Sequence, residues 1–346
     1  MVTIDVMTNT RPVREVLAWS RSVIEPAMRA AVDTLSPSMR RVAGYHFGWW
    51  DADEVPAGDA GGKVIRPTLT LLAAEAVGGS PDSAVPAAVA VEFVHNFSLL
   101  HDDVMDGDLS RRHRPTAWSV FGTGPAVLAG DAMLTLAFDV VASSTHPAAQ
   151  DGMRMLSNAV QKLVSGQAED VSFEQRADVK LSECLAMAGE KTGSLLACAC
   201  AVGGLFGGGS ASEIERLGRF GEKLGLAFQL VDDLLGIWGD SVVTGKPVYS
   251  DLASRKKSLP VVAALTSGTE AGAELSELYH REQPLSDDEL VHAAELIDGA
   301  GGRSWSQERA DGLLVEALSD LHTVETSPRA VAELAALAWL TTHRDH

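Results

Sequence analysis

The chain has 346 residues, which allows about two domains or one large one. Hydrophobic residues make up 46% and charged residues 22%, a globular composition that excludes a disordered chain. With 28 basic and 47 acidic residues the net charge is −19, which argues against a nucleic-acid partner because phosphate neutralisation needs a basic face. A local cluster of Lys and Arg can still bind a small anion.

Helical spacing of Ala- and Leu-rich segments dominates the chain, and stretches that alternate apolar and polar residues are few. We predict helices over residues 12–34, 66–78, 82–105, 118–145, 150–175, 180–206, 210–237, 257–267, 270–282, 287–300, 304–321 and 326–342. Clusters of Gly and Pro mark breaks at 36–38, 56–62, 78–82 and 207–209. The sequence therefore predicts an all-α protein, with a disordered tail over residues 1–11 and a single domain over residues 12–346.

Two further segments bear on location and surface. The longest uncharged run, residues 192–212, contains six glycines, and we predict a buried helix of a bundle rather than a membrane span. The three cysteines cannot form a disulfide framework and are interpreted as buried thiols in a reducing cytoplasm. No signal-peptide pattern opens the chain. The aromatic-rich segment 45–62 is interpreted as a packed loop, with a contact surface as the alternative.

The first segment that suggests chemistry is GGKVIRP, residues 61–67. Its two glycines permit close approach of the backbone to a ligand. Lys63 and Arg66 are three residues apart, so they share one face of an opening helical turn and suit an anionic group. Taken alone, the segment is equally a loop followed by a helix start.

An acidic segment follows at residues 101–116, HDDVMDGDLSRRHRPT. Asp102 and Asp106 are four residues apart, so both carboxylates face the same way on a helix, with Asp103 beside them. Like charges at that spacing destabilise a helix unless a cation shares them. Magnesium suits the site, because it binds one or two carboxylates together with phosphate oxygens and water. Arg111 and Arg112 could hold the same phosphates by forked hydrogen bonds.

A second acidic segment, FQLVDDLLGIWGD, covers residues 228–240. Asp232 and Asp233 lie near the end of a mostly apolar helix. The segment after it supplies Lys246, Asp251, Lys256 and Lys257. Two such pairs, each trailed by basic residues, indicate two acidic clusters that face across a cavity and grip a diphosphate through several metal ions.

The three segments, in this order, resemble the trans-isoprenyl diphosphate synthases, also called polyprenyl synthetases. Residues 128–138, 166–170 and 191–194 also look like segments of that family. The resemblance implies an isoprenoid synthase-type helical bundle with a central cavity. It also implies a reaction in which magnesium helps the allylic diphosphate to leave. The double bond of isopentenyl diphosphate then attacks the resulting cation, and the departing diphosphate takes up the proton.

The resemblance assigns roles to individual residues. Asp102, Asp106 and Asp232 resemble the residues of the family that bind magnesium, and Asp103 and Asp233 resemble residues that support them. The resemblance implies three magnesium ions per active site. Arg111, Lys191 and Lys246 resemble the residues of the family that bind the allylic diphosphate. Residues that resemble the isopentenyl diphosphate site are Lys63, Arg66, His95 and Arg112. Thr192 and Gln229 resemble the polar residues of the family that lie near the developing allylic cation.

Product length is predicted from the two residues that precede Asp102 by five and four positions. Phe97 is bulky and Ser98 is small, so one ring forms a floor beneath the growing chain. This pattern resembles the archaeal-type geranylgeranyl diphosphate synthases, with farnesyl diphosphate as the alternative product. Phe97 could instead merely pack against a neighbouring helix. The resemblance also suggests a homodimer.

The sequence departs from the family pattern at two positions. Gly236 stands where the second motif, usually DDxxD, has its last acid, which puts magnesium affinity in doubt. Trp118 stands where a histidine is common. Gly236 keeps a class I terpene cyclase open as a second reading, although residues 232–260 lack the polar triplet of bacterial cyclases. The segment YHFGWWDAD resembles that of synthases encapsulated by shell proteins, but only about ten residues precede the first predicted helix, too few for the usual cargo extension.

Overall fold

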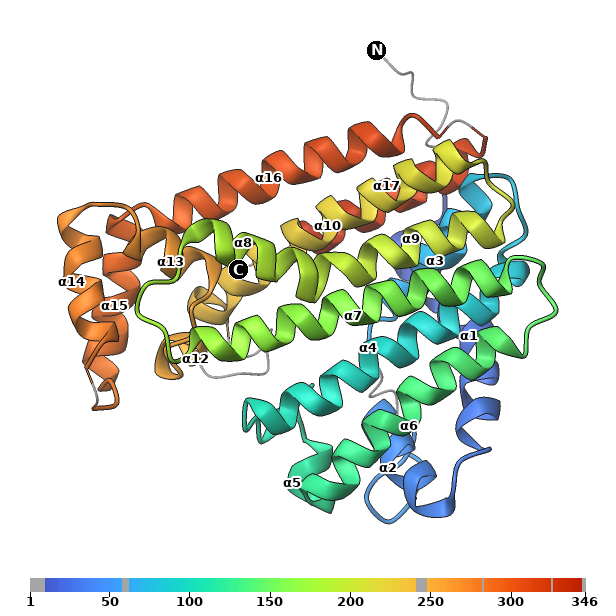
Figure 1. The fold of residues 1–346 in the computed structure, drawn as a ribbon, viewed down its shortest axis with the longest axis horizontal. Coiled ribbons are helices and arrows are strands. Elements are labelled where there is room, and N and C mark those ends of the chain that lie inside the picture. The colour runs from blue at the N-terminus through green and yellow to red at the C-terminus, as the bar shows by residue number, and fades with distance from the viewer. Residues whose placement is uncertain (1–9, 58–61, 241–247, 282, 325, 344–346) are drawn as a thin grey trace. The chain divides into compact units, whose positions relative to one another are not determined.

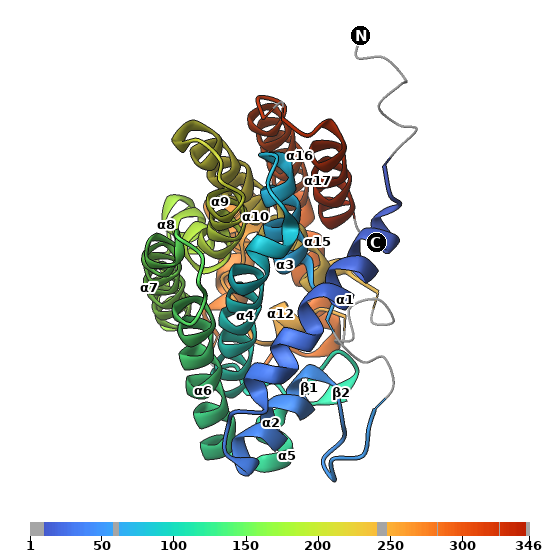
Figure 2. The same cartoon turned by 90° about the vertical axis from the view of Figure 1, so that its right-hand side faces the viewer.

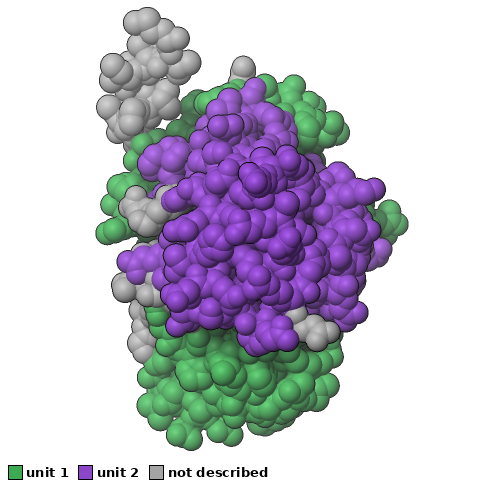
Figure 3. All heavy atoms as spheres, turned by 90° about the vertical axis from the view of Figure 1, so that its left-hand side faces the viewer, with its two compact units in different colours: residues 1–160, 195–219, 320–337 green, residues 161–194, 220–319, 338–346 purple. Residues whose placement is uncertain are grey.

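The computed structural model consists almost entirely of helices (Figure 1). It describes residues 10–57, 62–240, 248–281, 283–324 and 326–343. The chain forms two compact units, coloured separately in Figure 3. One comprises residues 1–160, 195–219 and 320–337, and the other comprises residues 161–194, 220–319 and 338–346. The predicted disordered tail lies mostly outside the described residues. Within it, Arg11 donates hydrogen bonds to Glu333 at 3.1 and 2.6 Å.

The first unit contains the elements α1 (Val13–Val32), α2 (Pro37–Phe47), α3 (Ile65–Ala76), η2 (Pro81–Ala84), α4 (Val85–Met105), β1 (Ser110–Arg111), β2 (Arg114–Pro115), α5 (Ala117–Phe121) and α6 (Thr123–Ala142). Helix α1 buries Val16, Ile24 and Val32 on one stripe, as the helical period requires. This helix lies across α3 and α4 and contacts both (Figure 2). Helix α4 is apolar on nearly all sides and packs along α6, so its polar C-terminal end is held firmly in place.

Helix α2 is absent from the predicted helices, because the proline within residues 36–38 indicates a break. Proline is well tolerated in the first turn of a helix, where its missing N–H has no partner to lose. Gly48, with φ 78°, ends the helix in the left-handed conformation. The loop predicted over residues 45–62 therefore begins three residues later than expected, after Phe47.

Two local features of the structure around the first acidic segment differ from the predicted helices. The predicted helix 118–145 is divided at Gly122, whose φ of 91° separates α5 from α6. Before α5, the antiparallel strands β1 and β2 pair Ser110 with Pro115 and Arg111 with Arg114. So short a hairpin offers no alternating pattern, which is why the sequence did not predict it.

The second unit contains α8 (Leu181–Ala188), η3 (Gly189–Gly193), α12 (Ser250–Ala253), α13 (Leu259–Leu265), α14 (Glu270–Tyr279) and α15 (Asp287–Gly299). Helices with residues in both units are α7 (Ala149–Phe173), α9 (Ser194–Phe206), α10 (Ala211–Trp238), α16 (Gly302–Leu321) and α17 (Pro328–Thr342). The predicted helix 180–206 contains a π-helical turn, η3, between α8 and α9. Such turns occur frequently at functional sites.

Three described segments are long and apolar enough to cross a membrane by length and composition alone. They are Pro81–Met105, Thr123–Ala142 and Leu181–Phe206, and 72%, 39% and 67% of their most apolar windows are buried inside the protein. Most apolar side chains from Leu195 to Val202 are buried, as predicted for this part of the chain.

Candidate active site

The first acidic segment lies at the C-terminal end of α4. Asp102 is half-buried, and Asp106 is exposed at the position that follows the last helical residue. Asp103 points inward instead, with 1% of its surface exposed. Burial raises the pKa of Asp103 to about 6, although the nearby Arg111 guanidinium opposes the shift. The pair of neighbouring aspartates thus contains one outward and one inward carboxylate.

The hairpin after α4 holds the inward carboxylate. Nε of Arg111 donates a hydrogen bond of 2.6 Å to Oδ1 of Asp103, and Oδ2 of Asp103 is buried without a hydrogen-bond partner. Arg112 and His113 form the hairpin turn with φ values of 53° and 61°. Both are in the left-handed region, as a two-residue turn of type I′ requires, at a cost for non-glycine residues of order 1 kcal/mol each. This turn directs consecutive arginines to different partners.

The GGKVIRP segment leads into α3. Lys63 is exposed and Arg66 is half-buried. Val64 between them has φ 47°, which is unusual for a β-branched residue. Nη1 of Arg66 is 3.1 Å from Nε2 of His95 on α4. Burial, reinforced by Arg66 and Arg112, holds the pKa of His95 well below its ordinary value, so the neutral ring accepts this hydrogen bond.

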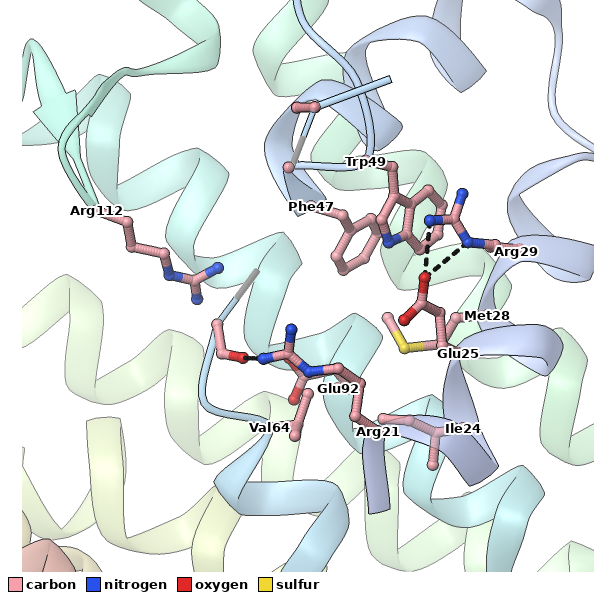
Figure 4. Close-up of a pocket in the computed structure, with 13 residues that line it drawn as sticks. Arg21, Ile24, Glu25, Met28, Arg29, Phe47, Trp49, Val64, Glu92 and Arg112 are labelled. Carbon is pink, nitrogen blue, oxygen red and sulfur yellow. Dashed lines mark hydrogen bonds and ion pairs between the residues drawn. The ribbon is translucent and has the colours of Figure 1, made fainter. Parts of the chain in front are cut away.

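A pocket of about 270 Å³ lies beside this segment (Figure 4). Arg21 of α1 lines it and donates a 2.6 Å hydrogen bond to the carbonyl oxygen of Gly62, which ties α1 to the loop that carries Lys63. Figure 4 shows the Arg112 side chain extending toward the pocket from the hairpin. On another side Arg29 pairs with Glu25 at 2.7 Å and lies over the Trp49 ring, with 4.4 Å between guanidinium carbon and ring centroid.

Behind the cationic residues lies a buried polar chain that sequence reasoning missed. Glu92 is 4% exposed and accepts a 2.9 Å hydrogen bond from Nδ2 of Asn96, whose Oδ1 is 3.1 Å from Nε2 of His46. Burial raises the pKa of Glu92, and the charges of Arg112, Arg66 and Arg21 oppose that shift. Glu92 is therefore an internal counter-charge for these arginines. A glutamate inside an otherwise apolar helix was the available signal in the sequence.

Phe97 and Ser98 lie one to two turns before Asp102 on α4. Phe97 is 6% exposed, and its ring stands edge-on to that of His101 with 4.9 Å between centroids. Ser98 is half-buried, and its hydroxyl donates to the carbonyl oxygen of His95 at 2.8 Å. Whether the Phe97 ring forms a floor beneath a growing prenyl chain stays a prediction.

The second acidic segment, in the other unit, repeats the division between inward and outward carboxylates. Asp232 on α10 is exposed, whereas Asp233 is 4% exposed. The Asp233 carboxylate accepts from Nε2 of Gln229 at 2.7 Å and from the backbone N–H of Leu259 at 2.9 Å. Burial raises its pKa to about 7 despite the opposing charge of Lys256. Asp233 therefore joins α10 to the start of α13.

The π-helical turn η3 presents the two predicted residues Lys191 and Thr192. Nζ of Lys191 is 2.6 Å from Oδ2 of Asp170, a partner that was not predicted as a site residue. The hydroxyl of Thr192 donates to Oε1 of Gln229 at 2.6 Å. Close packing makes this possible: a Cβ at Gly225 of α10 would lie 2.6 Å from Cα of Gly193. Lys246, the remaining predicted residue, lies outside the described residues.

Thus the structure brings together Arg66, His95 and Arg112 near the first acidic segment in one unit, and Lys191, Thr192, Gln229 and Asp233 in the other. Lys63 is exposed on the loop before α3. Within the described residues, no group of three or more His, Cys, Asp or Glu side chains is arranged to hold a metal ion by itself.

Comparisons with known proteins agree with this geometry. Residues 57–297 match the model of the family described as polyprenyl synthetase. The chain is 48% identical to a (2E,6E)-farnesyl diphosphate synthase of Mycobacterium tuberculosis, covering 95% of this chain and 92% of that protein. A geranylgeranyl diphosphate synthase of the same species is 43% identical, with coverages of 92% and 91%.

Solved structures share the fold. A polyprenyl synthetase from Streptomyces coelicolor aligns with a TM-score of 0.91 at 46% identity, covering 96% of this chain and all of that one. A geranylgeranyl pyrophosphate synthase from Corynebacterium glutamicum, complexed with isoprenyl diphosphate and magnesium, aligns with a TM-score of 0.77 at 26% identity, covering 96% and 97%. The predicted all-α isoprenoid synthase fold is confirmed, and the chain belongs to the polyprenyl synthetase family of trans-prenyltransferases.

Proposed function

We propose that this prenyltransferase condenses isopentenyl diphosphate with allylic diphosphates in a magnesium-dependent reaction, and that its main product is geranylgeranyl diphosphate. The observation that carries the product assignment is the pairing of buried Phe97 with the small Ser98 before Asp102. Membership of the family supports the two substrate classes.

The residues present fit magnesium. Asp102, Asp106 and Asp232 are hard oxygen donors that are half-buried or exposed at the ends of α4 and α10. Their neighbours Asp103 and Asp233 are committed to protein partners instead. The described residues provide no complete cage, which suits an ion that keeps water and binds substrate phosphates. The magnesium named in the Corynebacterium structure supports this proposal, and three ions per site remain part of it.

When bound, magnesium would neutralise the leaving diphosphate. The chain's own residues then have three tasks. Lys63, Arg66 and Arg112 bind the diphosphate of isopentenyl diphosphate, and Glu92 acts electrostatically on the two arginines. Hydroxyl and amide oxygens of Thr192 and Gln229 offer dipoles to the developing positive charge. The third task is to exclude water, which would otherwise capture the cation as an alcohol. The departing diphosphate can accept the proton, so the mechanism requires no protein base.

Farnesyl diphosphate is the second candidate product. The observation that favours it is the 48% identity to a protein named as a farnesyl diphosphate synthase, against 43% to one named as a geranylgeranyl diphosphate synthase.

We also propose a cytoplasmic homodimer. The three cysteines are free buried thiols, which suits a reducing compartment. Helix α6 is strongly apolar but only partly buried, and its Leu128 is 57% exposed. Native mass spectrometry and sedimentation at micromolar concentration test the dimer, and a monomer under those conditions would contradict it.

The deciding experiment is incubation with isopentenyl diphosphate and each of dimethylallyl, geranyl and farnesyl diphosphate, with magnesium and after chelation by EDTA. Chain-length analysis of the products is the readout. We expect C20 products that depend on magnesium. A C15 product would overturn the length assignment alone, whereas the absence of any condensation product would overturn the proposed function.

A further inference from the structure

The second acidic motif lacks a side chain at its last position. Asp232 and Gly236 are four residues apart on α10, and residues at that spacing share one helix face, with about 5–6 Å between Cβ atoms. In the first motif, Asp102 and Asp106 occupy the equivalent spacing with two carboxylates. The second motif therefore has one outward carboxylate on α10 where the first motif has two.

The space beside Gly236 is occupied by the carboxylate of Asp251. A Cβ built on Gly236 would lie 2.6 Å from Cγ and 2.9 Å from Oδ1 of Asp251, and would also overlap Oδ2. A carboxyl group from α12 thus fills the volume that a side chain at residue 236 would need. Glycine leaves this space free, because a side chain at residue 236 would require the carboxylate of Asp251 to move.

The surrounding structure holds Asp251 in this place. Leu252, the next residue, is fully buried and belongs to the same hydrophobic cluster as Ile237, the residue after Gly236. The backbone carbonyl oxygen of Asp251 accepts a hydrogen bond of 2.9 Å from the N–H of Lys256. Asp251 is half-buried, and the hydroxyl of Ser250 lies 3.5 Å from its Oδ1.

Both acidic and basic residues lie in the electrostatic environment of the Asp251 carboxylate. Asp251 acts electrostatically on Asp233 and Tyr279, and Lys256 acts on Asp233 and Asp170. Carboxylates that face one site repel each other, and a cation bound between them removes that repulsion. A divalent ion that also binds phosphate oxygens is such a cation.

We propose that Asp251 replaces the missing last acid of the second motif, so that Asp232 and Asp251 together bind a divalent metal ion of the diphosphate site. This proposal rests on the proposed function. It makes Gly236 a requirement of the site rather than a defect: the carboxylate is supplied by a neighbouring helix, and position 236 is kept empty to admit it.

The test measures metal binding without turnover. Mn²⁺ is titrated into the full-length protein with inorganic pyrophosphate, and free Mn²⁺ is followed by electron paramagnetic resonance. We expect Asp251→Asn to weaken Mn²⁺ binding about tenfold or more, the range found when groups supporting a metal site are removed. Gly236→Ala should weaken it comparably, because the methyl group displaces the carboxylate. Circular dichroism reports whether each variant is folded.

A carboxylate swap gives the sharpest outcome. Asp251→Ala removes the carboxylate and vacates its space, and Gly236→Asp in that background restores a carboxylate from α10. We expect the double variant to recover Mn²⁺ affinity to within about threefold of the parent. Glu277→Gln, which removes one exposed charge on α14, is the matched control for long-range electrostatics.

Two results would overturn the proposal: Mn²⁺ affinity in folded Asp251→Asn equal to that of the Glu277→Gln control, or a folded double variant that binds no better than Asp251→Ala. If Asp251→Asn does not fold, Gly236→Ala decides the question, because it leaves Asp251 present. Absence of prenyl products from the parent would contradict the proposed function but would leave the comparison of Mn²⁺ affinities intact.

Discussion

The guanidinium of Arg112 lies directly against the backbone of Gly62. A Cβ on Gly62 would come within 2.6 Å of Nη2 and 2.8 Å of Cζ of Arg112. The two residues are fifty positions apart, one at the hairpin turn and the other next to Lys63. This contact brings the cations of two sequence motifs to one place, and Gly62 is the residue that permits it.

Gly62→Ala should therefore displace Arg112. We expect the KM for isopentenyl diphosphate to rise about tenfold, since a charge-assisted hydrogen bond contributes about 1.5–3 kcal/mol and is weakened rather than removed. Steady-state kinetics measure it. Gly124→Ala is the control, because a Cβ there meets nothing within 4 Å. Equal KM values for the two variants would show that Arg112 does not bind this substrate.

Lys63→Ala and Arg66→Ala should raise the KM for isopentenyl diphosphate more than the KM for the allylic substrate. Both residues precede or open α3, and Arg66 contacts His95 on α4. Each variant loses a charged contact with the diphosphate, so we expect the KM for isopentenyl diphosphate to rise at least tenfold. If both variants kept parental kinetics for isopentenyl diphosphate, a one-substrate reaction such as terpene cyclisation would be favoured.

Asp102→Ala and Asp232→Ala should each reduce kcat about a hundredfold or more while leaving the helical circular dichroism unchanged. Losing about 3 kcal/mol of transition-state stabilisation has that effect on the rate. Both side chains lie at least partly in solvent, so their removal leaves no buried cavity. Asp139→Ala, an exposed aspartate on α6, is the control. Turnover near that of the control at saturating magnesium would contradict the role of these carboxylates.

Phe97→Ala should lengthen the product. The ring is 6% exposed and packs against His101, so its removal opens space along α4 and allows the prenyl chain to pass. The variant should also lose about 3–5 kcal/mol of unfolding free energy, because a buried aromatic side chain is deleted. Product analysis by mass spectrometry gives the chain length. A folded, active variant with an unchanged product would show that Phe97 only packs the core.

His46→Gln should make stability less dependent on pH. Burial lowers the pKa of His46 to about 3 from its ordinary 6.5. Below pH 6.5 His46 is protonated in the unfolded chain but stays neutral in the folded protein. The free energy of unfolding therefore falls as pH falls from 6.5 toward 3. Between pH 7.5 and 5 this effect lowers the free energy of unfolding of the parent by about 2 kcal/mol, and His46→Gln should not show this loss.

Urea unfolding at the two pH values measures the difference for His46→Gln. Glu92 has a raised pKa and the opposite pH dependence, but it is present in both proteins. A pH dependence equal to that of the parent would show that His46 titrates normally.

Much of the fold and the residue types of the site could be predicted from local patterns. The helical period and the Gly and Pro breaks predicted nearly all of the long helices, because apolar stripes must be buried whatever their partners are. Spacing along one helix placed Asp102 and Asp106 on the same face. The failures were local as well: Pro37 starts a helix rather than breaking one, and the hairpin at residues 110–115 is too short for a periodic signal.

The resemblance distinguished Asp102 and Asp232 as metal ligands from the supporting Asp103 and Asp233, but the partners that hold the inward carboxylates could not be predicted from the sequence. Asp103 turns inward because the turn at Arg112 and His113 directs Arg111 to it, and Asp233 does so because Leu259 offers a backbone N–H. Burial then separates their pKa values from those of ordinary carboxyl groups.

By itself, the sequence determined which helices form and which of them carry acids and bases, since helix period and side-chain chemistry are properties of neighbouring residues. Only the tertiary structure decided which groups meet: Arg112 with Gly62, Lys191 with Asp170, and Asp251 with Gly236. The contact between Asp251 and Gly236 changes how the second acidic motif is interpreted. An absent side chain can be judged only when the group that fills its space is known, and that group comes from a separate helix, fifteen positions along the chain.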